Sequence, residues 1–158
     1  MARQFSLIGR SDAVSPGRIL NLYVDGGSRG NPGPAAAAAV LTDQAGHVVH
    51  QGGYYLGKAT NNVAEYQGLI RGLEAARRLG AAQVTVHSDS ELLVRQMQGH
   101  YRVKAPHLQP LHQQAGELCR QFDSCRIVHV RREQNVLADQ LVNQALDARR
   151  DVAGPAAV

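Results

Sequence analysis

Hydrophobic and polar positions change their spacing along the chain, which separates a strand-rich first part from a mixed second part. Residues 20–25, 36–42 and 47–57 are rich in small or β-favouring residues, and polar, glycine-containing turns separate them. This order predicts three antiparallel strands joined as a meander. The first strand is expected to end at Asp25, where glycine, serine, asparagine and proline follow.

A helical period begins after the third strand. In residues 60–79 the apolar side chains recur every three or four positions, and Gly80 follows as a stop signal. Further strands are expected at 83–88 and 125–130, and further helices at 90–98, 110–122 and 135–149. Helical crossovers place the later strands parallel to the first. The pattern therefore predicts an α/β fold with a five-stranded mixed sheet flanked by helices.

The length of 158 residues is typical of one domain with one core. Residues 1–17 mix charge and serine and end in a Pro-Gly break, which predicts a flexible N-terminal extension. Residues 18–150 are expected to form the folded domain, and residues 151–158 a disordered tail.

Composition narrows the class of protein. A net charge of +4 favours a polyanionic partner, and 44% apolar residues argue against disorder. Cys119 and Cys125 have no second pair, so neither a zinc ribbon nor a disulfide framework is indicated. No apolar run has the length of a signal peptide or a membrane span. A soluble, cytoplasmic, monomeric protein that does not engage membranes is expected.

Two aspartates are expected at the carboxyl ends of parallel strands, the edge at which open α/β sheets place their sites. Asp25 ends the first strand, and Asp89 follows the strand at 83–88. For Asp89, which lies between two serines, capping of the next helix is the alternative.

Two further acids lie in expected helices. Glu65 shares its helix face with uncharged residues, and Asp139 lies on an apolar stripe, so both are expected to border the buried side. The alternatives are a first-turn Glu65 that points into water, favoured by the helix dipole, and a solvated Asp139.

Considered together, the four acids favour a metal site over the separate alternatives given for each of them. Several carboxylate oxygens on rigid elements at one edge are the ligands that Mg²⁺ prefers. Two such ions a few Å apart activate a water and stabilise the leaving oxygen of an in-line displacement at phosphorus. The sequence therefore predicts metal-dependent phosphodiester hydrolysis.

Four motifs, at residues 23–33, 60–65, 88–90 and 135–139, resemble those of the type 1 ribonucleases H in order and spacing. The resemblance covers about residues 19–148 and implies a ribonuclease H-like fold. It also implies an endonuclease that cuts the RNA strand of RNA/DNA hybrids, leaving 3′-hydroxyl and 5′-phosphate ends. The implied cofactors are two Mg²⁺ ions, with Mn²⁺ as a substitute. It assigns metal binding and catalysis to Asp25, Glu65, Asp89 and Asp139.

The resemblance also implies substrate contacts. Asn31, Asn61 and Asn62 match positions that touch nucleic acid, and Thr60 matches one that helps to hold a DNA phosphate. Contacts to sugar and phosphate would explain sequence-tolerant cleavage, and ribose 2′-hydroxyls distinguish RNA from DNA. Helix capping is the alternative for Asn61 and Asn62.

Two stretches depart from the family pattern. The segment between the third and fourth acids is short and lacks tryptophan, which implies a weaker grip on the hybrid than in members with a basic protrusion. Its basic residues are Arg95, His100, Arg102, Lys104 and His107. The loop 130–135 has no histidine, as in protrusion-lacking members, so Arg132 is the candidate to assist proton movement or product release. A phosphate contact, or a solvated pair with Arg131, is the alternative.

Two other functions stay open. One is a non-catalytic module that binds hybrid or duplex RNA, against which the presence of all four acids argues. The other is a DNA-cutting or transposase-type enzyme of the same fold, against which the Gly-Asn-Pro-Gly and Thr-Asn-Asn runs argue. The seven histidines are given no catalytic role, and His129 is expected to belong to the preceding strand.

Overall fold

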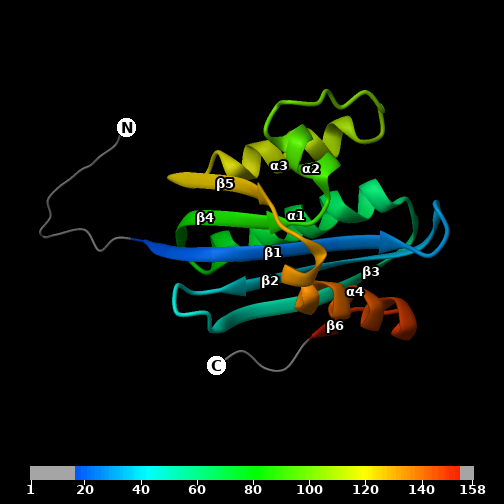
Figure 1. Ribbon diagram of the computed structural model, residues 1–158, viewed down its shortest axis with the longest axis horizontal. Helices are drawn as coiled ribbons and strands as arrows, with labels where there is room; N and C mark the ends of the chain where they lie inside the picture. Colours follow the sequence, from blue (N-terminus) through cyan, green and yellow to red (C-terminus); the bar gives the residue numbers. More distant parts are fainter. Residues whose placement is uncertain (1–16, 154–158) are drawn as a thin grey trace, which may run out of the picture.

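The structure is a computed structural model that describes residues 17–153. Its sheet has the strand order β5-β4-β1-β2-β3-β6. The strands are β1 (Arg18–Ser28), β2 (Gly33–Thr42), β3 (Val48–Ala59), β4 (Ala81–Ser88), β5 (Ser124–His129) and β6 (Val152–Ala153). The helices are α1 (Asn61–Arg78), α2 (Glu91–Met97), α3 (Gln109–Cys119) and α4 (Val136–Ala148), with a 3₁₀ turn η1 (Arg132–Gln134) before α4. Figure 1 shows the order of these elements along the chain.

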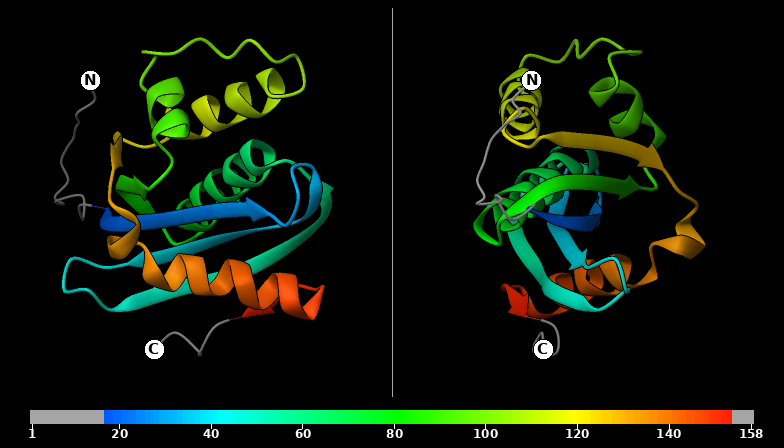
Figure 2. Two further views of the ribbon diagram at one scale, coloured as in Figure 1. Left: turned by 45° about the vertical axis from the view of Figure 1, so that its right-hand side comes forward. Right: turned by 90° about the vertical axis from the view of Figure 1, so that its left-hand side faces the viewer.

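The sheet separates two hydrophobic cores. Helices α1, α2 and α3 share the larger core with one face of the sheet, and α4 packs against the opposite face (Figures 1 and 2). Strand β2 belongs to both, because Ala39 and Leu41 lie in the first core while Ala38 and Val40 lie in the second. Its run of five buried alanines, residues 35–39, lets helices approach both faces closely.

The strand directions predicted from the sequence are confirmed. Strands β1, β2 and β3 pair antiparallel, and β4 and β5 run parallel to β1. No helix among residues 17–153 combines the length and the apolarity that crossing a bilayer requires.

The predicted count of five strands is wrong by one. Val152 and Ala153 pair with Gly53 and Gly52 of β3, and the Asp151 carboxylate accepts a hydrogen bond from the Tyr55 backbone N–H at 2.8 Å. The ordered chain thus extends into the segment expected to be a disordered tail. The rest of that tail, 154–158, and residues 1–16 of the expected extension lie outside the described residues.

Strand β1 also continues past Asp25, where it was expected to end. Its parallel partner β4 stops at the pair Val24–Ser88, whereas its antiparallel partner β2 pairs as far as Ser28–Ala35. Asp25 therefore lies where the parallel pairing ends, inside a strand that one neighbour still holds.

Two glycines allow α1 to lie directly on the sheet. A Cβ atom at Gly26 would lie 2.3 Å from the carbonyl carbon of Ala64, and one at Gly68 would lie 2.7 Å from the carbonyl oxygen of Asp25. Neither contact tolerates a side chain. This close approach of helix and strand brings Glu65 up to Asp25.

Candidate active site

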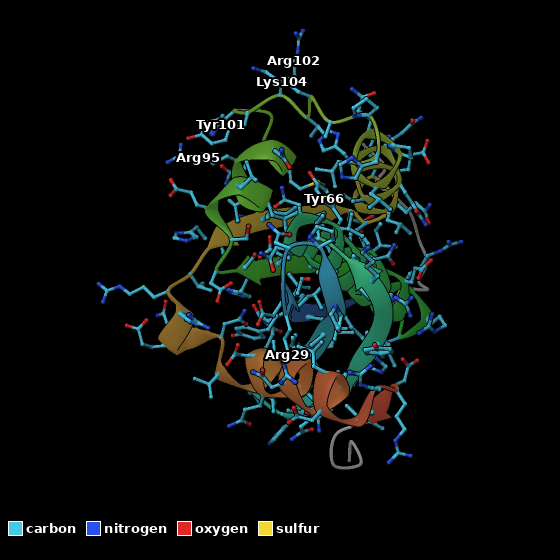
Figure 3. All side chains as sticks on the ribbon, turned by 90° about the vertical axis from the view of Figure 1, so that its right-hand side faces the viewer. Arg29, Tyr66, Arg95, Tyr101, Arg102 and Lys104 are labelled. Atoms are coloured by element: carbon cyan, nitrogen blue, oxygen red, sulfur yellow. The ribbon has the colours of Figure 1, made fainter. Side chains whose placement is uncertain are left out.

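Three of the four predicted acids meet at the carboxyl edge of the sheet. Carboxylate oxygens of Asp25, Glu65 and Asp89 lie within 4.8 Å of one another. They line an open cavity of about 650 Å³, to which β1, β5, α1 and α4 also contribute. Arg29, which lies at this cavity just after the end of β1, is labelled in Figure 3.

Hydrogen bonds around α2 decide between the two interpretations of Asp89. The N-cap of α2 is Ser90, whose hydroxyl accepts a hydrogen bond from the Leu93 N–H at 3.2 Å. The same hydroxyl is hydrogen-bonded to the Glu65 carboxylate. Asp89 is therefore free of the capping role and faces the cavity, and Ser90 links α2 to the acid on α1.

Glu65 and Asp139 both line the cavity, and both are partly buried. Glu65 lies in the three-acid cluster. Asp139 lies on the first turn of α4, outside the 4.8 Å cluster, but its charge acts on both Asp25 and Asp89. The fourth acid is thus at the cavity without joining the other three at ligand distance.

Burial and mutual repulsion disfavour the charged forms of these acids. Burial, followed by the nearby Asp89 carboxylate, raises the pKa of Asp25 to about 8. Burial raises the pKa of Glu65 to about 7, against the hydrogen bond from Ser90. Burial also raises the pKa of Asp89, and the Arg132 guanidinium opposes this rise. A cluster of acids that resists ionisation on its own is stabilised by cations.

The cluster fits a divalent cation. Three carboxylates with oxygens this close form the hard donor set that Mg²⁺ and Mn²⁺ take in proteins. The raised pKa values of Asp25 and Glu65 agree with this fit. Part of each rise comes from repulsion between neighbouring carboxylates, and a bound cation would relieve that repulsion.

Basic side chains line the other walls of the cavity. Arg131 and Arg132 come from the segment before α4, Arg29 from the loop after β1, and His129 from the end of β5. Arg29 forms an ion pair with Asp147 at 2.8 Å, which ties the loop to α4. Arg132 and His129 both act on the charge of Asp89. His129 lies in the strand as expected, yet it also reaches the cavity.

The predicted substrate residues form one hydrogen-bonded junction. The Asn61 N–H donates to the Asn31 side-chain oxygen at 3.0 Å, and the Ser28 N–H donates to the Asn61 side-chain oxygen at 2.8 Å. Within residues 17–153 neither side-chain NH₂ group donates to the protein, so both remain available as donors.

The helix cap in this region is Thr60. Its hydroxyl accepts a hydrogen bond from the Val63 N–H at 3.2 Å, so neither Asn61 nor Asn62 caps α1. Of the four predicted substrate residues, only Asn61 lines the cavity itself. Asn31 is connected to the cavity only by its hydrogen bond with Asn61, and Thr60 and Asn62 are the chain neighbours of Asn61.

Sequence reasoning missed three residues of the site: His129, Arg29 and Ser90. His129 ends a strand whose carboxyl end points to the same edge as Asp25 and Asp89, which is the signal that could have found it. Ser90 is visible in the sequence only as a helix cap, and the position of Arg29 depends on its tertiary ion pair.

The fold and the acidic site place the chain in the ribonuclease H-like class of proteins. A family model described as reverse transcriptase-like matches residues 23–145. The chain belongs to this ribonuclease H family.

Relatives cover most of this chain. The bifunctional protein Rv2228c of Mycobacterium tuberculosis is 48% identical over 128 residues, which are 80% of this chain and 35% of that protein. This chain thus spans about a third of that relative. Ribonuclease HI of Halobacterium salinarum is 45% identical over 131 residues, which are 83% of this chain and 65% of that protein.

Solved structures agree with these relatives. The N-terminal RNase H domain of Rv2228c superposes with a TM-score of 0.81 at 45% identity, covering 83% of this chain and 95% of that chain. LC11-RNase H1 in complex with an RNA/DNA hybrid has a TM-score of 0.78 at 44% identity, covering 82% of this chain and 98% of that chain.

Proposed function

We propose that this protein is an endonuclease that hydrolyses the RNA strand of RNA/DNA hybrids with two divalent cations, leaving 5′-phosphate and 3′-hydroxyl ends. The observation that carries the proposal is the convergence of Asp25, Glu65 and Asp89 within 4.8 Å at the sheet edge. The solved complex of a 44% identical ribonuclease H1 with an RNA/DNA hybrid supports the choice of substrate.

Asp25, Glu65 and Asp89 hold the cations, and Asp139 completes the acidic wall from α4. When bound, the two ions supply activation of a water and stabilisation of the leaving oxygen. The chain itself supplies rigid positions: Asp25 is held inside β1, and the Ser90 hydroxyl fixes the Glu65 carboxylate. Mg²⁺ is the proposed physiological ion, and Mn²⁺ its substitute.

The junction of Asn31 and Asn61 is the proposed contact to the nucleic-acid backbone. Because each side-chain oxygen already accepts a backbone N–H, the amide NH₂ groups are oriented as donors to phosphate or sugar oxygens. Thr60 and Asn62 at the start of α1 extend this surface, where the positive end of the helix dipole favours a phosphate. Donors of this kind read the backbone and carry little base specificity.

Arg132 is the proposed cation that assists proton movement or product release. It lies in the η1 turn, lines the cavity, and stabilises the charged form of Asp89. An exposed guanidinium beside the acids attracts the scissile phosphate and its product, because both are anionic. His129, from the adjacent strand end, adds a second group whose charge acts on Asp89.

The function is tested by cleavage of one sequence in three forms. End-labelled RNA/DNA hybrid, RNA duplex and DNA duplex are incubated with Mg²⁺, with Mn²⁺ and with chelator. The expected result is metal-dependent cutting of the RNA strand of the hybrid, with products that a 5′-phosphate-dependent ligase rejoins. Binding of the hybrid without cleavage in either metal would indicate a non-catalytic hybrid-binding module. Cleavage of the DNA duplex would indicate a different nuclease.

We also propose that the protein acts as a monomer, since a single chain contains all four acids and the proposed substrate contacts. Size-exclusion chromatography with light scattering tests the oligomeric state. The RNA duplex in the cleavage assay tests whether the site accepts a second strand with 2′-hydroxyls.

A further inference from the structure

Arg29 lies at the start of the tight loop between β1 and β2, at the acidic cavity. Its backbone N–H donates to the Pro34 carbonyl at 2.8 Å, and the Ser28 hydroxyl beside it donates to the Ala59 carbonyl at 2.8 Å. A Cβ atom at Gly33 would overlap the Arg29 carbonyl oxygen, so the loop closes tightly at this residue. The backbone therefore fixes the point from which the Arg29 side chain extends.

The side chain of Arg29 is held from the opposite wall by α4. Its Nη2 atom lies 2.8 Å from the Asp147 carboxylate and donates to the Asn143 side-chain oxygen at 3.4 Å. Asn143 in turn donates to the carbonyl of Asp139, the fourth acid, at 3.1 Å. Arg29 is labelled beside α4 in Figure 3. The loop thus holds the backbone of this residue, and α4 holds one nitrogen of its guanidinium.

The rest of the guanidinium is available to a ligand. A guanidinium carries five N–H donors, and α4 engages only Nη2. Within residues 17–153, Nε and Nη1 of Arg29 donate to no protein group. The side chains of Arg29 and Asp147 are 50% and 71% exposed, and an ion pair this exposed stabilises a fold little. An oriented guanidinium with free donors at a cavity fits a phosphate, which accepts two parallel hydrogen bonds.

Both walls place this guanidinium away from the clustered acids. Along β1 and its end, four residues separate Arg29 from Asp25, about 13 Å at the usual rise per residue. Along α4, Asp147 lies eight residues after Asp139, about 12 Å of helix axis. A phosphate held by Arg29 is therefore a different one from the phosphate at the acids.

We propose that Arg29 binds a phosphate of the RNA/DNA hybrid that lies outside the cleavage centre, an inference that rests on the proposed function. Nε and Nη1 donate to the phosphate, while Nη2 keeps its contacts to Asp147 and Asn143. Because these contacts hold the guanidinium at the cavity before the substrate arrives, little side-chain entropy is lost on binding.

The first test is fluorescence anisotropy with end-labelled hybrid in chelator, where metal-dependent cleavage does not occur. Arg29→Gln is expected to weaken binding about fivefold to tenfold and to lower the slope of log affinity against log salt by about one. Arg29→Lys should keep the slope and lose about threefold in affinity, because lysine lacks the planar fork. Arg77→Gln, an equal charge change at the far end of α1, is the control, expected within about twofold of wild type. Wild-type affinity in Arg29→Gln would overturn the proposal.

Asp147→Asn separates phosphate binding from a purely structural ion pair. Asparagine keeps an oxygen for Nη2 but removes a negative charge beside the phosphate, so binding should be unchanged or up to about twofold tighter. An ion pair that served only the fold would be broken in Arg29→Gln and Asp147→Asn alike, and equal weakening in both would contradict phosphate binding. Thermal midpoints within about 2 °C of wild type are expected for both variants.

Steady-state cleavage in Mg²⁺ locates the contact relative to the reaction. Arg29→Gln should raise KM and leave kcat within about twofold of wild type, since the guanidinium holds a phosphate away from the acids. A lower kcat at unchanged KM would assign Arg29 to the reacting phosphate and overturn the proposal. A wild-type protein that does not cleave the hybrid would remove the proposed function, whereas the binding measurements in chelator judge Arg29 independently.

Methylphosphonate substitution identifies the phosphate and its strand. Hybrids in which one linkage at a time, on either strand, is replaced by an uncharged methylphosphonate are bound by wild type and by Arg29→Gln. At the linkage that faces Arg29, wild type should lose about fivefold to tenfold in affinity, and Arg29→Gln should lose nothing further. Additive losses at every linkage would show that Arg29 contacts no single phosphate and would overturn the proposal.

Discussion

Two charged regions of this molecule are built in opposite ways. The clustered acids Asp25, Glu65 and Asp89 come from β1, from α1 and from the residue after β4, and none of them is fully exposed. The cations Arg102 and Lys104 are exposed on the connector between α2 and α3, a segment without regular secondary structure (Figure 3). Tyr101 is 48% exposed beside them.

The two regions differ in how much support from the backbone their charged groups need. Like charges repel, so the acids need a backbone that forces them together, and the contact between Gly26 and α1 provides it. Exposed cations need no such support, and each one contributes little to binding a screened polyanion. Substitutions are therefore expected to change cleavage rates by orders of magnitude in the first region and affinity by small factors in the second.

The largest effect is expected for Asp25→Asn or Asp89→Asn. Each change removes a ligand charge at nearly constant volume, and the loss of several kcal/mol of transition-state stabilisation should lower kcat by about 10³-fold or more. Cleavage of labelled hybrid in Mg²⁺ measures it, with circular dichroism as the check on folding. Asp123→Asn, an equal charge change at an exposed turn before β5, is the control. Full activity in either site variant would remove the acids from the mechanism.

Gly26→Ala tests the contact that assembles the cluster. The added Cβ would lie 2.3 Å from the Ala64 carbonyl carbon, so we expect a loss of about 3 kcal/mol in the free energy of unfolding. At Gly27 the nearest atom to such a Cβ is a Val142 methyl at 3.9 Å, an ordinary contact. Gly27→Ala is therefore the matched control, expected within about 1 kcal/mol of wild type in urea denaturation. Similar losses in both variants would assign the effect to strand β1 in general.

The pH dependence of stability without metal tests the repulsion directly. The pKa values of about 8 for Asp25 and about 7 for Glu65 are both raised, so between about pH 4 and pH 8 the folded state holds protons that the unfolded chain has released. In chelator the free energy of unfolding should therefore fall as pH rises and level off above about pH 8.

Mg²⁺ should reverse this loss, since the cation takes the place of the protons. We expect Mg²⁺ to raise the thermal midpoint more at about pH 9 than at about pH 5, and Asp25→Asn to flatten the slope measured in chelator. Equal shifts with Mg²⁺ at both pH values would show that these acids are not the groups that titrate.

The meeting of Asp25 and Asp89 at one edge of the sheet could be predicted from the sequence, because it follows from the order and direction of the strands. Parallel strands end at one edge, so Asp25 and Asp89 had to converge there. The sixth strand was missed because Val152 and Ala153 are too few to show a period, and their pairing depends on the exposed edge of β3. The cap at Thr60 is a local hydrogen bond, from the Val63 N–H three residues on, whereas the presence of His129 at the cavity depends on tertiary packing.

Arg132 combines features of the two regions, because its side chain is exposed like the connector cations and yet lowers the pKa of Asp89 in the acidic cluster. We expect Arg132→Gln to lower kcat by about tenfold and Arg132→Lys to retain more of the rate, because lysine keeps the charge. Arg131 lines the same cavity, but it is not one of the main influences on the pKa of Asp89, so Arg131→Gln should change mainly KM. Steady-state cleavage of the hybrid separates the two, and equal losses of kcat would contradict a specific role for Arg132.

The smallest effect is expected on the connector. Arg102→Gln combined with Lys104→Gln removes two exposed cations, which should weaken hybrid binding about threefold. The slope of log affinity against log salt should fall by about one for each phosphate that the variant leaves without a cation. Arg95 is less suited to this test, because it pairs with Glu91 at 3.1 Å and lies over the Tyr101 ring.

The control for the connector is Arg77→Gln with Arg78→Gln, an equal charge change on exposed residues at the far end of α1, about 18 Å along the helix axis from Glu65. Fluorescence anisotropy with labelled hybrid at several salt concentrations measures both variants. A weakening confined to the connector variant would make that segment a second, weak anchor for the polyanion. Equal small effects in both would mean that the +4 net charge of the whole chain, and no particular segment, provides the nonspecific attraction.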